Sequence, residues 1–190
     1  MTAAAHALLL DIPERLETAN LTLAATRAGM GAVVHEGLLE SMEELKRWMP
    51  WARVDQVLEQ TEIHTREAQA KWHSRLEIDF CFFRRDDASF VGKGGLHTID
   101  WSVPKFEVGY WIRSSCSGRG IATEATAALV ALGRDHLGAK RIELACDAKN
   151  APSRRVAEKS GFTLEGIHRH ARRDNAGELA DKCMYAITFP

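Results

Sequence analysis

The sequence lacks a cysteine framework, a strong net charge and a long apolar run, and each absence excludes a class of protein. Its four cysteines lie far apart and include no C-x-x-C pair. Three of them, Cys81, Cys146 and Cys183, fall in strand-like runs, where a free thiol behaves as a small hydrophobe. This use of cysteine favours a reducing compartment.

The charge and the apolar pattern exclude two further kinds of partner. The formal net charge is −1, so no broad field attracts nucleic acid or an anionic membrane. Residues 3–10 are apolar, but no basic region precedes them, and Asp11 and Pro13 cut the run short. Neither a signal peptide nor a membrane span is therefore predicted. We expect a cytoplasmic protein without a nucleic-acid or membrane partner.

The remaining composition is that of a globular domain. The chain has 190 residues, of which 45% are hydrophobic and 27% charged, values that fit one soluble domain with an ordinary core. No internal repeat, low-complexity tract or linker divides it. A single domain over residues 1–190 is predicted, with residues 1–20 as a loosely held leader.

Period-two and helical patterns alternate along the chain. Strands are predicted at residues 21–26, 76–85, 89–99, 106–112, 140–147, 162–172 and 179–189, and helices at 29–47, 55–74, 120–138 and 151–160. The strand–helix–strand unit over 106–147 is a crossover, which forces its two strands to be parallel. The chain is therefore predicted to be an α/β (α+β mixed) protein with a single mixed sheet of about seven strands and flanking helices.

Residues 106–125 join a strand to a helix through the polar turn Ser117-Gly118-Arg119-Gly120, and they carry the strongest functional signal. A glycine-rich turn that leads into a helix leaves backbone N–H groups free at the positive end of the helix dipole, where phosphate binds. Glycine also takes unusual φ values and lets a pyrophosphate approach the main chain closely. A phosphate-binding turn is therefore predicted here, with a simple structural turn as the alternative.

Two nucleotide-binding motifs do not fit this turn. A dinucleotide fingerprint requires glycine where Thr123 stands, and a P-loop requires Gly-Lys followed by Ser or Thr. The turn instead resembles the pyrophosphate loop of the GNAT N-acetyltransferases, Arg/Gln-x-x-Gly-x-Gly/Ala. Gly120 and Ala122 fit that pattern, whereas Ser117 departs from it at the usual Arg/Gln position. The strings GYWI, GRGIATEA and NAPSRRVAEKSGF are similar to the RimJ/RimL branch, the ribosomal-protein N-terminal acetyltransferases.

This resemblance implies the GNAT fold, in which the two crossover strands splay apart and the pantetheine arm of acetyl-CoA, the co-substrate, lies in the gap. It implies that a backbone N–H near Ile112 or Arg113 polarises the thioester carbonyl. It also implies that one run of backbone amides binds the CoA pyrophosphate: Gly118, Arg119, Gly120, Ile121, Ala122 and Thr123.

Asn150 and Pro152 mark the start of the helix predicted at residues 151–160, since asparagine caps helices and proline suits the first turn. The resemblance adds that Asn150 bonds the pantetheine amide and that Ser153 protonates the leaving thiolate. Both interpretations can hold together. Arg154 or Arg155 could reach the adenosine 3′-phosphate.

Acetylation of an amine also requires a base, because an ammonium group cannot attack a thioester. Glu107 is the first candidate, since it lies on the central strand and matches the acidic position in similar proteins. A strand glutamate paired with a neighbouring cation is the competing interpretation, and His97 is the alternative base. His168 and His170 lack a third ligand at metal spacing, so no metal site is predicted.

The predicted function is transfer of an acetyl group from acetyl-CoA directly to a primary amine. The resemblance suggests the N-terminus of a ribosomal or other protein as acceptor, with a small amine as the alternative. A non-catalytic acyl-CoA-binding module is the hypothesis of another class. Trp48 and Trp51, beside the helix-breaking Pro50, could wall the acceptor cleft, and a homodimer is a possible assembly.

Overall fold

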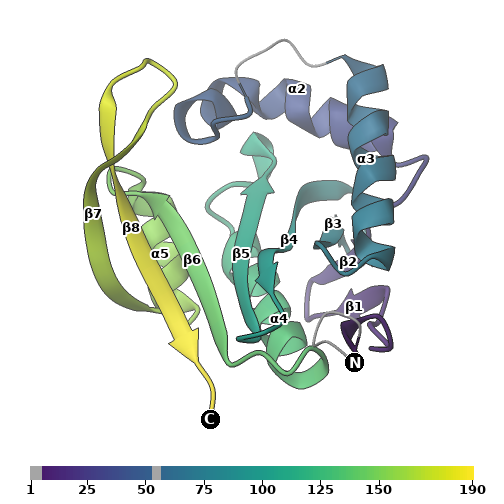
Figure 1. The fold of residues 1–190 in the computed structure, drawn as a ribbon. Coiled ribbons are helices and arrows are strands. Elements are labelled where there is room, and N and C mark those ends of the chain that lie inside the picture. The colour runs from purple at the N-terminus through teal and green to yellow at the C-terminus, as the bar shows by residue number, and fades with distance from the viewer. Residues whose placement is uncertain (1–5, 53–56) are drawn as a thin grey trace.

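A computed structural model describes residues 6–52 and 57–190 (Figure 1). Within these residues, one mixed sheet of eight strands has the order β1-β2-β3-β4-β5-β6-β8-β7. The strands are β1 Arg15–Glu17, β2 Leu21–Ala25, β3 Ile78–Arg84, β4 Phe90–Asp100, β5 Lys105–Ile112, β6 Arg141–Asp147, β7 Thr163–Arg173 and β8 Leu179–Thr188. The helices are α2 Gly31–Trp48, α3 Leu58–His73, α4 Ile121–His136 and α5 Ala151–Lys159, with a short 3₁₀ turn at Ser114–Cys116.

The prediction of a single mixed sheet is confirmed, with eight strands in the described part of the chain instead of about seven. The additional strand is β1, which pairs antiparallel with β2 inside the segment expected to be a loose leader. Three residues are too few to show an alternating pattern, so this strand could not be recognised from the sequence. Ile12, just before this strand, is buried. The start predicted for the second helix, residue 55, lies outside the described residues.

The crossover strands β5 and β6 separate soon after they meet. They pair as parallel strands only at three positions, which end at Glu107 opposite Glu143. Beyond that point β5 continues beside β4, whereas β6 continues beside β8, and a gap opens between them (Figure 1). The predicted splayed parallel pair is confirmed.

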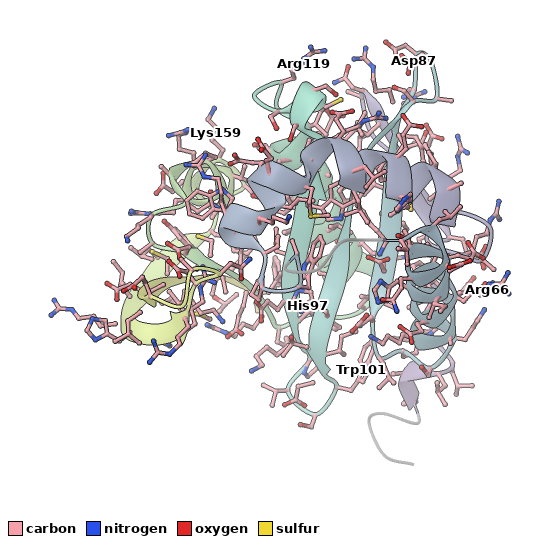
Figure 2. The ribbon with its side chains drawn as sticks, turned by 90° about the horizontal axis from the view of Figure 1, so that it is seen from above. Arg66, Asp87, His97, Trp101, Arg119 and Lys159 are labelled. Carbon is pink, nitrogen blue, oxygen red and sulfur yellow. The ribbon has the colours of Figure 1, made fainter. Side chains whose placement is uncertain are left out.

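The two faces of the sheet are covered by different helices. On one face α4 and α5 pack on the main core, where Phe106 and Val108 of β5 meet Leu129 of α4. On the other face α2 covers a smaller cluster that includes Phe90 and Trp111. Figure 2 shows α2 crossing over the strands on this face. Among the described residues, no helix is both long and apolar enough to cross a membrane.

Candidate active site

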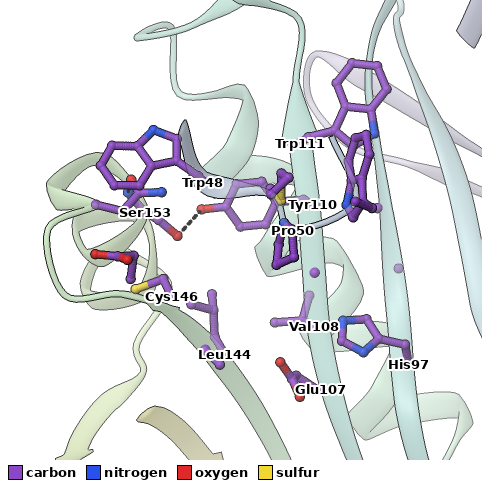
Figure 3. Close-up of a pocket in the computed structure, with 18 of the residues that line it drawn as sticks. Trp48, Pro50, His97, Glu107, Val108, Tyr110, Trp111, Leu144, Cys146 and Ser153 are labelled. Carbon is purple, nitrogen blue, oxygen red and sulfur yellow. Dashed lines mark hydrogen bonds between the residues drawn. The ribbon is translucent and has the colours of Figure 1, made fainter. Parts of the chain in front are cut away.

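A cavity of about 680 Å³ lies where β5 and β6 diverge (Figure 3). Its walls come from the end of α2 and the residues after it, from strands β3 to β6, from the start of α5 and from the β7–β8 hairpin. Side chains of β5 alternate between the two faces of the sheet. Tyr110 lies on the α5 side, because its hydroxyl meets Ser153 of α5 at 3.3 Å. Glu107 therefore lies on the opposite side, so the gap connects the two faces.

The glycine turn before α4 leaves a row of backbone donors unused. Gly118 and Gly120 have φ of +77° and +82°, the left-handed conformation that favours glycine, and no atom stands where their Cβ would be. Within the described part of the chain, no hydrogen bond uses the N–H groups of residues 118–123. Arg119 is exposed (Figure 2). This open row of amides at a helix start fits a pyrophosphate.

The backbone of β5 corrects one prediction. The N–H of Arg113 donates to the carbonyl of Val91 at 2.9 Å and is unavailable to a thioester. The Arg113 side chain is occupied as well, with Glu40 and, at 2.6 Å, Glu36 as partners. Successive N–H groups of a strand point to opposite edges, so the N–H of Ile112 points away from β4 toward the gap. Of the two predicted amides, only Ile112 fits.

Asn150 and Ser153 meet at the start of α5. The Asn150 Oδ1 accepts a hydrogen bond from the Ser153 N–H at 3.1 Å, so the helix-cap interpretation is confirmed. Arg154 is held within the fold by the hydroxyl of Tyr185, at 3.2 Å, whereas Arg155 is exposed. The roles of Asn150 and Ser153 toward CoA stay predictions.

Tyr110 is a site residue that sequence reasoning missed. It belongs to the same alternating row as Phe106 and Val108, where it reads as a core residue. Only the tertiary structure brings its hydroxyl to Ser153, across the gap (Figure 3). Burial raises the pKa of Tyr110 to about 12, so the phenol keeps its proton at neutral pH.

The two candidate bases face each other on neighbouring strands. Glu107 on β5 pairs in register with His97 on β4, and both line the cavity (Figure 3). Among the described residues, Glu107 makes no ion pair, so the structure does not support the competing interpretation of a salt-bridged strand glutamate. The His97 Nδ1 lies 2.9 Å from the Thr98 hydroxyl, which leaves its Nε2 toward Gly109.

The end of α2 and the turn of the β7–β8 hairpin are in contact beside the cavity. Trp48 and Trp51 both line the cavity. Asn175, in the hairpin turn, donates hydrogen bonds of 2.8 Å to the carbonyls of Lys46 and Met49. This contact ties the hairpin to the end of α2, two segments that the sequence places more than a hundred residues apart.

The splayed sheet, the open glycine turn and the cavity through the gap define the GNAT class of fold. RimL, a ribosomal L7/L12 alpha-N-protein acetyltransferase solved with coenzyme A, has a TM-score of 0.85 to this chain at 24% identity, over 94% of this chain and 97% of that one. The family model described as the acetyltransferase (GNAT) domain matches residues 21–163. The chain therefore belongs to the GNAT acetyltransferase domain family.

Curated relatives match over shorter segments. YdaF of Bacillus subtilis (strain 168) is 36% identical over 42% of this chain and 44% of its own length. A ribosomal-protein-serine acetyltransferase of Escherichia coli (strain K12) is 30% identical over 48% of this chain and 50% of its own length. The chain thus matches about half the length of these relatives.

Proposed function

We propose that this protein is an acetyl-CoA-dependent N-acetyltransferase that acetylates a primary amine, with a protein or peptide N-terminus as acceptor. One observation carries the proposal: the gap between β5 and β6 links the hydroxyl pair Tyr110–Ser153 on one face to Glu107 and His97 on the other. Direct transfer needs this arrangement, because the donor and the acceptor must meet with a base on the acceptor side.

The residues on the α4/α5 side fit the requirements of CoA. The amides of residues 118–123 hold the pyrophosphate, and the Asn150 side-chain amide, whose oxygen caps α5, binds the pantetheine arm. The usual arginine or glutamine of the loop is Ser117 here, so the backbone donors carry this contact. When bound, acetyl-CoA supplies the acetyl thioester.

The chemistry then divides between the two faces. Glu107 or His97 removes a proton from the acceptor ammonium group, which frees the lone pair that attacks the thioester carbonyl. The Ile112 N–H donates a hydrogen bond to the carbonyl oxygen as negative charge develops there. As the new C–N bond forms, the nitrogen loses its second proton to solvent. As the C–S bond breaks, Ser153 gives a proton to the sulfur and receives one from Tyr110 through their hydrogen bond, and Tyr110 then regains a proton from solvent.

A protein N-terminus is favoured by the similarity to the ribosomal-protein-serine acetyltransferase of Escherichia coli, which acts on a ribosomal protein. The aromatic side chains of Trp48 and Trp51, which line the cavity, suit an extended peptide end. We also place the reaction in the cytoplasm, where the four free thiols stay reduced.

The test is thiol release from acetyl-CoA with a panel of acceptors, namely peptides that differ in residue one, free amino acids, polyamines and aminoglycosides. Turnover with peptides led by particular residues supports the proposal. Turnover with small amines alone would mean that the acceptor is a small amine and not a protein N-terminus. Tight acetyl-CoA binding by calorimetry without turnover on any acceptor overturns the proposal in favour of a binding module.

A further inference from the structure

The arm of the sheet beyond the gap contributes three charged side chains to one wall of the cavity. They are Asp147 on β6, Lys182 on β8 and Arg172 on β7, and all three line the cavity. Asp147 pairs in register with Lys182, so both side chains lie on the same face of the sheet. Arg172 pairs with Ala180, two residues from Lys182, and therefore shares that face. The proposed mechanism uses none of them.

The hydrogen bonds of this group leave positive charge toward the cavity. Asp147 is fully engaged, because its Oδ1 accepts from the Lys149 N–H at 2.8 Å and its Oδ2 accepts from the Arg172 Nη2 at 2.5 Å. Only 6% of the Asp147 side chain and 20% of the Arg172 side chain are exposed. Within the described part of the chain, Lys182 makes no ion pair, and the other guanidinium N–H groups of Arg172 have no acceptor. The three side chains together carry one net positive charge.

The charged side chains on the opposite wall leave a net negative charge. Glu77 is neutralised by Lys71, at 2.9 Å, and Asp79 is neutralised by Lys93. Glu107 has no ion-pair partner among the described residues. The cavity is therefore negative on the β5 side and positive on the side of β6, β8 and β7. An acceptor with an ammonium group and a carboxylate would match both walls.

We propose that Arg172 and Lys182 form a subsite for a carboxylate that the acceptor carries close to its reactive amine. Asp147 positions the guanidinium, whose planar N–H groups match a carboxylate, and Lys182 adds charge. The inference rests on the proposed function and deepens it, since it defines which amines are acetylated. The carboxylate belongs either to an acidic residue near a protein N-terminus or to the α-carboxyl group of a free amino acid.

The experiment compares kcat/KM for matched acceptors, a Ser-Asp peptide against a Ser-Asn peptide, and serine against serinamide. For at least one pair, we expect kcat/KM to be about tenfold or more higher for the acidic partner. This ratio corresponds to the free energy of a hydrogen bond to a charged group. Preference within the peptide pair identifies an acidic N-terminal sequence, and preference within the serine pair identifies a free amino acid. Measurable turnover at equal rates within both pairs overturns the proposal.

Variants test whether the named residues cause the preference. Lys182→Gln removes one charge, and the double change Asp147→Asn with Arg172→Gln removes the guanidinium without leaving a buried carboxylate unpaired. In both variants, the ratio of kcat/KM between the acidic and the neutral acceptor is expected to fall toward one. Arg169→Gln, at an exposed arginine of the same hairpin outside the cavity, is the matched control and keeps it. A preference that survives in both test variants contradicts the assignment.

A binding measurement separates this proposal from the proposed function. Calorimetry with the acetylated Ser-Asp and Ser-Asn peptides, and with N-acetylserine and its amide, needs no turnover. Tighter binding of the acidic member of either pair, by about tenfold, supports the subsite even if every acceptor fails in the assay. Equal affinity within both pairs overturns it.

Discussion

Glu107 and His97 lie directly opposite each other on β5 and β4, and both side chains line the cavity. Cβ atoms of directly opposed residues in antiparallel strands lie about 4.5–5.5 Å apart. An amine that reaches one side chain therefore reaches the neighbourhood of the other. The pair can divide the work of a base, with one group taking the proton and the other orienting the ammonium.

Glu107→Gln and His97→Gln separate these two roles. Loss of a general base lowers kcat by about 100-fold or more, and the rise of rate toward alkaline pH flattens. Loss of the orienting group mainly raises KM and keeps the pH profile. Both variants should bind acetyl-CoA as the wild type does, measured by calorimetry. If both variants keep the wild-type pH profile and kcat, neither residue is the base.

Gly109→Ala tests the position of His97. A Cβ added at Gly109 would stand 2.7 Å from the His97 Nε2, so the imidazole ring must move. We expect kcat/KM to fall by about tenfold or more, because a misplaced catalytic group loses its productive geometry. Gly166→Ala is the control, since nothing lies within 4 Å of its Cβ position. Wild-type activity in Gly109→Ala would show that the ring position is unimportant.

Gly120→Glu tests the phosphate-binding turn. The new carboxylate would stand at the amides of residues 118–123, and a side chain at φ +82° strains the turn. We expect the Kd for CoA to rise by about 100-fold or more, since like charge and bulk both oppose the pyrophosphate. Gly138→Glu adds the same charge at another open glycine, with φ +65°, and should bind CoA normally. Equal affinity in Gly120→Glu would place CoA elsewhere.

Tyr110→Phe and Ser153→Ala test the proton supply to sulfur. Each change should lower kcat by about 10- to 100-fold without changing CoA affinity, because a general acid acts only in the transition state. The double variant should lose little more than the worse single variant, since the two hydroxyls act as one unit. Because the pKa of Tyr110 is raised to about 12, its proton is not lost in the usual assay range. Fully additive losses would contradict a relay.

Glu124 should make stability depend on acid pH. Partial burial raises the pKa of this carboxyl, but hydrogen bonds from Thr18 and Asn20 outweigh burial, so the pKa lies below the ordinary 4.5. A group with a lowered pKa stabilises the fold above its unfolded pKa, and the contribution is lost as pH falls through the folded pKa.

Glu124→Gln should therefore lower the free energy of unfolding by about 1 kcal/mol at neutral pH. The difference from the wild type should shrink below pH 4.5, which urea denaturation at several pH values measures. A difference that stays constant across this range would show that the charge of Glu124 does not matter.

Long elements with a regular pattern were predictable from the sequence. The alternation of β5 and the apolar spacing of α4 need no partner to be recognised, and the crossover rule makes β5 and β6 parallel. The three-residue strand β1 escaped because its only signal is its pairing with β2. The divergence of β5 and β6 was expected only from the family resemblance, because no residue pattern in either strand indicates where their pairing ends.

The site divides in the same way. The local features, namely the glycine turn before α4 and the cap at Asn150, were predictable because each depends on the conformations and hydrogen bonds of neighbouring residues. Contacts between distant groups, in contrast, became known from the tertiary structure alone. It set His97 opposite Glu107, joined Tyr110 to Ser153, occupied the Arg113 amide with Val91 and brought Arg172 to Asp147. Such contacts depend on strand register and helix packing, which are fixed by the whole core rather than by any local stretch of chain.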